Sequence, residues 1–357
     1  MNSNKFILLA FCFAASAVAA QSPTEYFNAG SSLQSWQDPG LSEVLEECSN
    51  PADPIAFPFT RSDPAHTQIQ AIELPPVNEG IDGIVADNSA WEMVWAWNGN
   101  NTDGPIATED GGLMFANNDA SNVIRLSPDG SAEIVYANLN TPGALSRNKQ
   151  GELFVLERGL NPAVKQLEPQ RQIFADTYQG DPLDCVGGIV NDLVADAKGG
   201  VYFTITQAGF YYADPEGEIT RYGNNVVGTN GIILSPEEDV LYVTNGPVVM
   251  AFDVREDGSL FNQREFGTLS SGGGDGMAVD NQGRLYVSTG SSVDVFATDG
   301  ERLGTIPGPQ GLHGVVFSGE DKRFLYAIVL RGTFQGMPDN WIIRIPIETQ
   351  GYLGRAK

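Results

Sequence analysis

The sequence predicts an all-β fold, a six-bladed β-propeller with an irregular N-terminal arm. A short phrase, a turn followed by an alternating strand, occurs six times: EDGGLMFA, KQGELFVL, AKGGVYFT, EEDVLYVT, NQGRLYVS and DKRFLYAI. Aligned on their central residues, the copies follow at intervals of 40, 48, 40, 44 and 40 residues; these are Met114, Phe154, Tyr202, Tyr242, Tyr286 and Tyr326. A period near 40 built from short strands and tight turns is typical of a propeller with one four-stranded blade per repeat.

The first 20 residues have the composition of a secretory signal. Lys5 precedes the apolar run FILLAFCFAASAV, and Ala-Val-Ala-Ala before Gln21 provides a small-residue cleavage site. The apolar run is too short to cross a bilayer, and no other candidate span exists in the sequence. We therefore expect a secreted or periplasmic protein with a cleaved signal over residues 1–20 and no membrane span.

The chain is strongly acidic. It has 20 Lys and Arg against 45 Asp and Glu, and loss of Lys5 with the signal leaves 19 against 45, a net charge of −26. This charge argues against nucleic acid and anionic membranes as partners. The apolar fraction of 41% is sufficient for one large core, while no pattern indicates an oligomeric state.

The arm precedes the repeats. Residues 21 to about 75 are rich in Ser, Pro, Asp and Gln and show little alternation, whereas SAWEMVWAWNG at 89–99 alternates as a strand does. Cys48 and Cys185 are the only cysteines beyond the signal. In an oxidising compartment we expect them to form one disulfide from the arm to the loop before the third blade; two free thiols are the alternative.

The blades fill the rest of the chain, so that residues 21–98 form the arm and closing strand and 99–357 the propeller. Approximate blade limits are 103–140, 141–187, 188–227, 228–270, 271–310 and 311–349. Hairpin turns between outer strands are marked by SPDG, DPEG, REDG and ATDG. The last repeat has room for about three strands after His313, so a strand from the arm is expected to complete it and leave no exposed edge.

Equivalent positions of the repeats become neighbours around the central channel. The residues 11 or 12 positions before the anchors are Asp103, Gly143, Asn191, Asn230, Asp275 and Gly314. Four of these six carry side-chain oxygens, and although each alone could be a turn residue, their common phase predicts one shared site. Two carboxylates and two amides suit Ca²⁺ or Mg²⁺. The chain has only two His, and no Cys lies near these positions, so a zinc site is disfavoured.

Several phrases resemble the SMP-30/gluconolactonase/LRE-like family of six-bladed propellers over about residues 100–345: TDGPIATEDGGLMFA, IVNDLVADAKGGVYFT, GTNGIILSPEEDVLYVTN, MAFDVREDGSLFNQREF and GGDGMAVDNQGRLYVS. Members of that family are lactone, ester or phosphoester hydrolases that depend on a divalent metal, usually calcium. The resemblance implies that Asn230 and Asp275 are metal ligands and that Asn191 contacts metal or substrate. Asp103 stands where the family usually has a glutamate, and the resemblance gives Asp275 the additional role of catalytic base.

Three positions near the predicted ring bear on substrate binding. Gly143 and Gly314 lack side chains, so we expect substrate to lie over blades two and six. His313 and Glu157 are candidates to contact it, with a solvated ion pair as the alternative for Glu157 and Arg158. In Glu157-Arg158-Gly159 the arginine replaces the histidine usual in the family. There is no G-x-S-x-G motif, so Ser-His-Asp catalysis is not supported.

The expected function is a secreted, metal-dependent lactonase. A divalent cation, most simply Ca²⁺, would act as Lewis acid on the lactone carbonyl while a water attacks and Asp275 takes its proton. An aryl-ester or organophosphate hydrolase on the same metal site is one alternative. A non-catalytic, ligand-binding propeller is another, because fold alone does not fix function. Polar residues at four of the six ring positions favour the enzyme.

Overall fold

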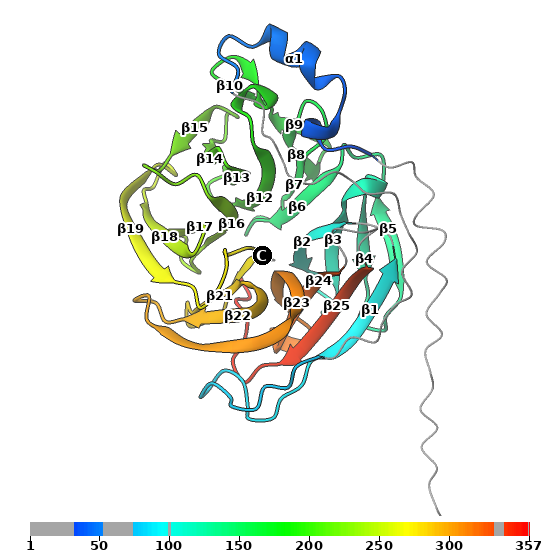
Figure 1. Ribbon diagram of the computed structural model, residues 1–357, viewed down its shortest axis with the longest axis vertical. Coiled ribbons are helices and arrows are strands. Elements are labelled where there is room, and N and C mark those ends of the chain that lie inside the picture. The colour runs from blue at the N-terminus through cyan, green and yellow to red at the C-terminus, as the bar shows by residue number, and fades with distance from the viewer. Residues whose placement is uncertain (1–31, 53–73, 99–100, 332–338, 356) are drawn as a thin grey trace, which may run out of the picture.

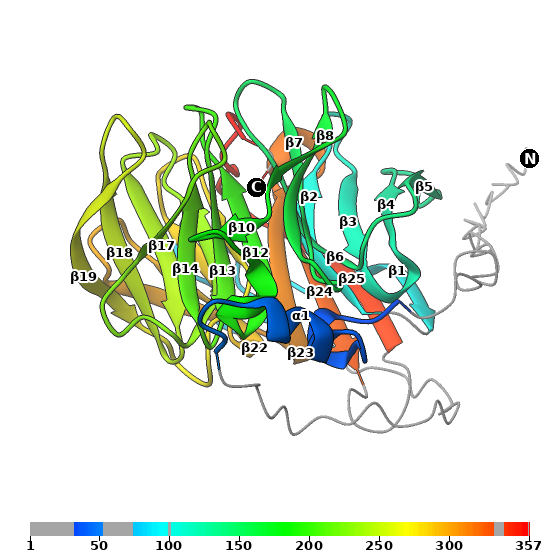
Figure 2. The same ribbon diagram turned by 90° about the horizontal axis from the view of Figure 1, so that it is seen from above.

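The chain folds into a ring of blades around a central channel (Figures 1 and 2). The computed structural model describes residues 32–52, 74–98, 101–331, 339–355 and 357. The predicted six-bladed propeller is confirmed by its sheets, although the last two blades are joined through one strand. The predicted signal at residues 1–20 lies outside the described residues.

In the first four blades, four strands follow one another from the channel to the rim. Blades one and two contain β2 (Thr102–Ala107), β3 (Leu113–Asn117), β4 (Asn122–Leu126) and β5 (Ala132–Tyr136), then β6 (Pro142–Arg147), β7 (Leu153–Glu157), β8 (Ala163–Glu168) and β9 (Gln172–Ala175). Blades three and four contain β12 (Ile189–Ala195), β13 (Val201–Thr206), β14 (Gly209–Ala213) and β15 (Ile219–Tyr222), then β16 (Thr229–Leu234), β17 (Val240–Asn245), β18 (Val248–Val254) and β19 (Leu260–Thr268). A short hairpin precedes blade three, formed by β10 (Thr177–Tyr178) and β11 (Asp181–Pro182).

Blades five and six share one long strand within a seven-stranded sheet. Its strands are β20 (Met277–Val279), β21 (Leu285–Ser288), β22 (Gly290–Phe296), β23 (Arg302–Ser318), β24 (Phe324–Arg331), β25 (Asp339–Pro346) and β1 (Glu92–Asn98). The first part of β23 pairs with β22 as the outer strand of blade five, and the second part pairs with β24 as the inner strand of blade six. Strand β1 pairs antiparallel with β25, so the arm completes the last blade as predicted.

In the part of the chain that the structure describes, helices are few and short. They are η2 (Ser35–Gln37) and α1 (Leu41–Glu47) in the arm, and η3 (Asn118–Ala120), η4 (Leu183–Val186) and η5 (Glu320–Lys322) among the blades. None of the helices in the described parts of the chain is long and apolar enough to cross a membrane.

The anchor strands are apolar because both of their faces are covered by neighbouring blades. In β13, Tyr202 packs with Ile232 and Leu241 of blade four, whereas the next residue, Phe203, packs with Phe154 of blade two. Successive side chains of a strand point to opposite faces, so each face of the sheet contributes to a different inter-blade core. This explains why the repeated phrase is hydrophobic at nearly every strand position.

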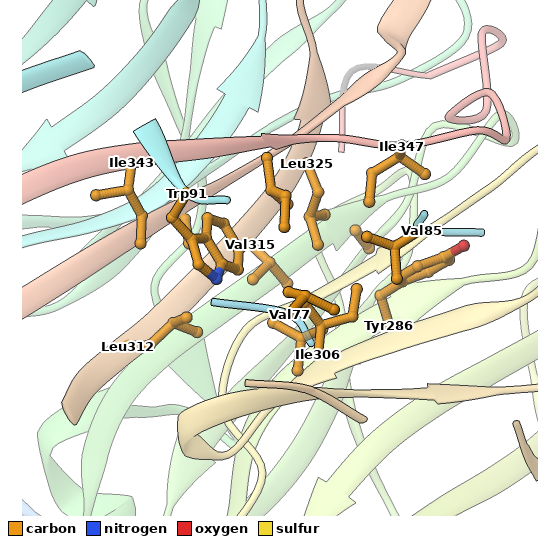
Figure 3. Packing of buried hydrophobic residues seen from close by; sticks show 14 of the residues in the cluster. Val77, Val85, Trp91, Tyr286, Ile306, Leu312, Val315, Leu325, Ile343 and Ile347 are labelled. Atoms are coloured by element: carbon orange, nitrogen blue, oxygen red, sulfur yellow. The ribbon is translucent and has the colours of Figure 1, made fainter. Parts of the chain in front are cut away.

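An apolar cluster joins the arm to blades five and six (Figure 3). Val77, Val85 and Trp91 of the arm pack there among the strands that close the ring. Trp91 is 4% exposed, and its Nε1 donates to the carbonyl oxygen of Pro307 at 2.7 Å. Full burial of an apolar side chain stabilises a fold by about 1.5–3 kcal/mol, so these residues hold the closing strand in place.

The last residues of the chain enter the ring, where Figure 1 shows the C-terminus at its centre. Arg355 Nη1 lies 3.2 Å from Glu238 Oε1, and its Nη2 donates to Leu234 O at 2.6 Å. The Lys357 ammonium binds the carboxylate of Asp192 on the innermost strand of blade three. All four charged groups are buried, so these ion pairs fill one end of the channel with polar contacts.

We expect Arg355→Met to lower the free energy of unfolding by about 3 kcal/mol, because it removes the close cationic partner of the buried Glu238 carboxylate, which keeps the Ala197 N–H at 2.8 Å and Lys149 at 3.4 Å. Chemical denaturation followed by tryptophan fluorescence measures the change. Arg171→Met is the matched control, since Arg171 is exposed and donates to a single carbonyl oxygen. Equal stability of the two variants would show that the Arg355 ion pair does not support the ring.

Candidate functional site

The four predicted oxygen-bearing residues meet at the axis of the ring. Asp103, Asn191 and Asn230 lie near the beginnings of innermost strands, and Asp275 comes just before β20. Register irregularities occur at this same phase in β2, β6, β12, β16 and β23. An irregularity of this kind bends the strand and re-aims a side chain. The repeat therefore supplies both the residue and the local distortion at the ring position.

These four residues line one small axial cavity of about 10 Å³. Roughly 10–15 Å³ in this measure is needed for one water molecule, so the space suits a single water or an ion. The close approach of the strands depends on Gly104, which has a φ of +53° and lies against Ala144; a Cβ there would be 2.2 Å from the Ala144 Cα. Lys357 forms part of the cavity wall.

Arg158 covers part of the ring. It follows β7, and its Nη2 lies 2.7 Å from Asp103 Oδ2, 2.7 Å from Asn191 Oδ1 and 2.7 Å from the Asn191 carbonyl oxygen. Its side chain is 4% exposed. Three oxygens thus accept hydrogen bonds from one nitrogen of a buried guanidinium. Asp103 and Asn191 therefore stabilise a positive charge on their side of the ring.

The space left by the two ring glycines is filled, so the structure does not support the open space on which the prediction of substrate over blades two and six is based. A Cβ on Gly143 would lie 1.9 Å from Arg158 Nε, and one on Gly314 would lie 3.1 Å from Pro105 Cδ. Absence of a side chain at a ring position made room for neighbouring protein atoms instead of a ligand.

The two carboxyl groups of the ring differ in their surroundings. Burial acts to raise the pKa of Asp103, but Arg158 and His313 outweigh it and hold that pKa below its ordinary value. Burial raises the pKa of Asp275 to about 7, against the opposing influence of His313. Within the described residues, the side chains of Asn230 and Asp275 make no hydrogen bond. Their oxygens are therefore available to a ligand.

The donor set fits a hard divalent cation. It combines two carboxylates with two amide oxygens around an ion-sized space, and such oxygens are the ligands that Ca²⁺ and Mg²⁺ prefer. Among the residues that the structure describes, no group of three or more His, Cys, Asp or Glu side chains is arranged to hold a metal. A cation site here therefore needs the amide oxygens as ligands. Asn230 and Asp275 are the two ligands whose side chains make no hydrogen bond among the described residues.

His313 and Glu157, the two predicted substrate contacts, both bind protein groups. His313 Nε2 donates to Thr102 O at 2.8 Å and lies 3.9 Å from Asp103 Oδ1. The imidazole therefore lies next to the axial site and contacts one of its carboxylates. The surroundings of Glu157 do not favour the predicted contact with substrate, which stays a prediction. Its carboxylate is 1% exposed, accepts from the Asn140 N–H at 2.9 Å and pairs with Lys165 at 2.6 Å. Glu157 and Arg158 therefore do not form the solvated ion pair that was the alternative, since Glu157 pairs with Lys165 and Arg158 with Asp103.

Figure 1 shows α1 of the arm at the outer edge of the ring, beside blades two and three. The predicted disulfide is confirmed: Cys48 and Cys185 are joined, with their Cα atoms 5.7 Å apart. The Ser35 N–H donates to the Arg158 carbonyl oxygen at 2.7 Å. Between arm and blades is a second cavity of about 80 Å³, and Arg158 belongs to its wall.

The sequence indicated neither Arg158 nor the covering arm as part of the site. Two signals could have suggested Arg158: the arginine at a position where histidine is usual, and the ring glycine at 143 that leaves room for a long side chain. No repeat extends into residues 32–52, so periodicity could not place the arm.

Comparisons with known proteins agree with this architecture. A family model described as the SMP-30/Gluconolactonase/LRE-like region matches residues 101–330. A gluconolactonase from Zymomonas mobilis is 26% identical over 255 residues, which cover 59% of this chain and 70% of that protein. A lactonase drp35 from Staphylococcus saprophyticus is 27% identical over 248 residues, covering 62% of this chain and 74% of the relative.

Solved structures show the same fold. A gluconolactonase from Xanthomonas campestris superposes with a TM-score of 0.64 at 22% identity, over 82% of this chain and 99% of that one. The calcium-binding protein regucalcin from Agrobacterium tumefaciens gives a TM-score of 0.58 at 17% identity, over 72% and 94% of the two chains.

Proposed function

The chain belongs to the SMP-30/gluconolactonase/LRE-like family, and from this we propose that it is a lactonase-type hydrolase assisted by a divalent cation, most simply Ca²⁺, on the channel axis. The observation that carries the proposal is the meeting of Asp103, Asn191, Asn230 and Asp275 around one ion-sized cavity. Relatives named gluconolactonase and lactonase support the reaction class, and a structural relative described as calcium-binding supports the cation.

The residues that would hold the cation are Asn230 and Asp275, with Asp103 and Asn191 completing the set. A divalent cation bound there would supply Lewis-acid stabilisation of the oxyanion formed when a lactone carbonyl is attacked. Asn230 and Asp275 make no competing hydrogen bond within the described residues, whereas Asp103 and Asn191 share their oxygens with Arg158.

Asp275 is the proposed base. It is the ring carboxylate without a guanidinium partner, and it lines the axial cavity. Asp103, by contrast, is bound to Arg158 and is held ionised by it. Arg158 lies at the wall of the outer cavity as well as on the ring, so it is placed to orient a substrate oxygen between the two spaces.

We propose a location outside the cytoplasm. The signal-like residues 1–20 support this, and so does the Cys48–Cys185 disulfide, because such bonds persist in oxidising compartments.

Acid release from a panel of lactones, aryl esters and organophosphates tests the function, with and without the chelator EGTA. We expect lactone hydrolysis that EGTA abolishes and added Ca²⁺ restores. Hydrolysis of aryl esters or organophosphates alone would assign the alternative chemistry to the same site. Absence of turnover on every class in the presence of Ca²⁺ would favour a non-catalytic binding propeller and overturn the proposal.

Calcium is expected to raise the melting temperature of EGTA-treated protein, because only the folded ring brings the four oxygen ligands together. Saturation at 100 times the dissociation constant corresponds to about 2.7 kcal/mol of added stability. Differential scanning fluorimetry across a Ca²⁺ series measures the shift. Asn230→Ala serves as the control variant, since it removes an unengaged ligand and should reduce the shift at each concentration. A melting temperature unaffected by Ca²⁺ would contradict the site.

A further inference from the structure

The cavity beneath the arm has a wall that the ring does not provide. Its volume is about 80 Å³. Since one water molecule needs about 10–15 Å³, the cavity has room for roughly five to eight. The arm contributes Trp36, Leu41 and Leu45, and the blades contribute Pro162, Leu183 and Val190. This space is large enough for a short carbon chain or a small ring, and most of its lining is apolar.

The polar side chains at this cavity are already paired. The Ser35 hydroxyl donates to Asp184 Oδ1, and Asp184 Oδ2 accepts from the Asn161 N–H at 3.0 Å. The indole Nε1 of Trp36 donates to Gln34 Oε1 at 3.1 Å. A ligand rich in hydroxyl groups would therefore lose its hydrogen bonds to water here and find few replacements, which is costly.

Arg158 is the exception among these polar groups. Its Nη2 is bound on the ring side, while its Nε is buried on the side of Gly143 and has no hydrogen-bond partner among the described residues. Arg158 thus links the wall of this cavity to the ring, and apolar side chains form most of the remaining wall. A ligand that matches it has an oxygen at one end and a hydrocarbon group at the other.

The arm is held in place over the cavity by several independent contacts. Cys48 is bonded to Cys185, and the Ser49 hydroxyl and backbone N–H donate to the Asp181 carboxylate at 3.0 Å and 2.9 Å. The Ala52 N–H donates to the Cys185 carbonyl oxygen at 2.9 Å. These contacts lie just after α1, so they position Leu41 and Leu45 as a fixed wall.

We propose that this cavity binds an apolar substituent of the substrate, so that the enzyme opens lactones bearing an alkyl side chain in preference to polyhydroxylated sugar lactones. The inference rests on the proposed lactonase function. Leu41 and Leu45 then act as specificity-determining residues supplied by the disulfide-anchored arm. Arg158 faces the lactone oxygen atoms while the side chain extends beneath α1.

The test is a series of δ-lactones on the full-length protein with Ca²⁺ present: δ-valerolactone, its methyl, propyl and pentyl derivatives, and glucono-δ-lactone. We expect kcat/KM to rise about fourfold for each methylene that enters the cavity. Leu45→Ala should lower kcat/KM about tenfold for the pentyl lactone and leave unsubstituted δ-valerolactone unchanged. Val44→Ala is the matched control, because Val44 is the adjacent, half-buried residue of α1 but does not line the cavity.

The inference would be overturned if kcat/KM did not change along the alkyl series, or if it were highest for glucono-δ-lactone. It would also be overturned if Leu45→Ala lowered kcat/KM equally for all substrates. Calorimetric binding of δ-valerolactam, with and without a pentyl group on the ring, keeps the two proposals separate because a lactam is not turned over. If no lactone is hydrolysed, the lactonase proposal fails, and the lactam pair still decides about the cavity. Tighter binding of the pentyl lactam that Leu45→Ala abolishes supports an apolar site; equal binding of both lactams refutes it.

Discussion

Asp275→Asn is expected to lower kcat by about 10²–10⁴-fold while the protein remains folded, because removal of a general base typically has an effect of this size. The amide has nearly the same shape as the carboxyl group and retains one oxygen that can face the axial cavity. It cannot accept a proton at neutral pH. Initial rates of lactone hydrolysis at saturating Ca²⁺, with circular dichroism as the measure of folding, give the result.

Asn230→Ala distinguishes a base from a ligand. Its side chain has an oxygen facing the same cavity but no proton-accepting role, so its loss should weaken Ca²⁺ binding and excess Ca²⁺ should restore the rate. Asp275→Asn should not be rescued in this way. Near wild-type turnover of Asp275→Asn at saturating Ca²⁺ would remove Asp275 from the base role. Asp192 would be the next candidate, although it already binds Lys357 and the Ile232 N–H.

Replacement of both Cys48 and Cys185 by serine is expected to lower the free energy of unfolding by about 4–5 kcal/mol in the chain-entropy model. The two residues are 137 positions apart, so the bond restricts a long loop in the unfolded chain. Guanidinium unfolding of the double variant against the wild type measures the difference.

Reductant supplies the control for the disulfide. Wild-type protein in dithiothreitol should match the double variant, and dithiothreitol should leave the double variant unchanged. Equal unfolding midpoints for wild type and double variant would mean that the bond does not stabilise the chain. Two alkylatable thiols in protein isolated without reductant would show that the bond is not formed.

The architecture could be predicted because a propeller repeats both its strands and its turns. Each anchor residue, such as Tyr202, is buried between two blades for the same reason, so one pattern appears six times. The need to close the ring also predicts the N-terminal strand in the last blade, where β1 pairs with β25. Ring positions follow from the same arithmetic, and Asp103, Asn191, Asn230 and Asp275 share a cavity as expected.

The sequence could not predict the direction of side chains that depends on contacts between blades. Glu157 and Arg158 are adjacent, yet one points to Lys165 and the other to the axis, which the sequence alone does not distinguish. Gly143 suggested open space, but the same missing side chain allows Arg158 to cross the ring. Lys357 reaches Asp192 from a segment outside any repeat, so its place in the channel had no sequence signal.

Calorimetric titration of EGTA-treated protein with Ca²⁺, paired with lactone hydrolysis at each point, tests the central claim most directly. The account predicts one Ca²⁺ per chain and a rate that rises in proportion to the bound fraction. It predicts weaker binding in Asn230→Ala, which removes an unengaged oxygen of the ring. Full lactone hydrolysis in EGTA, with no heat of Ca²⁺ binding, would contradict a cation-assisted site on the propeller axis.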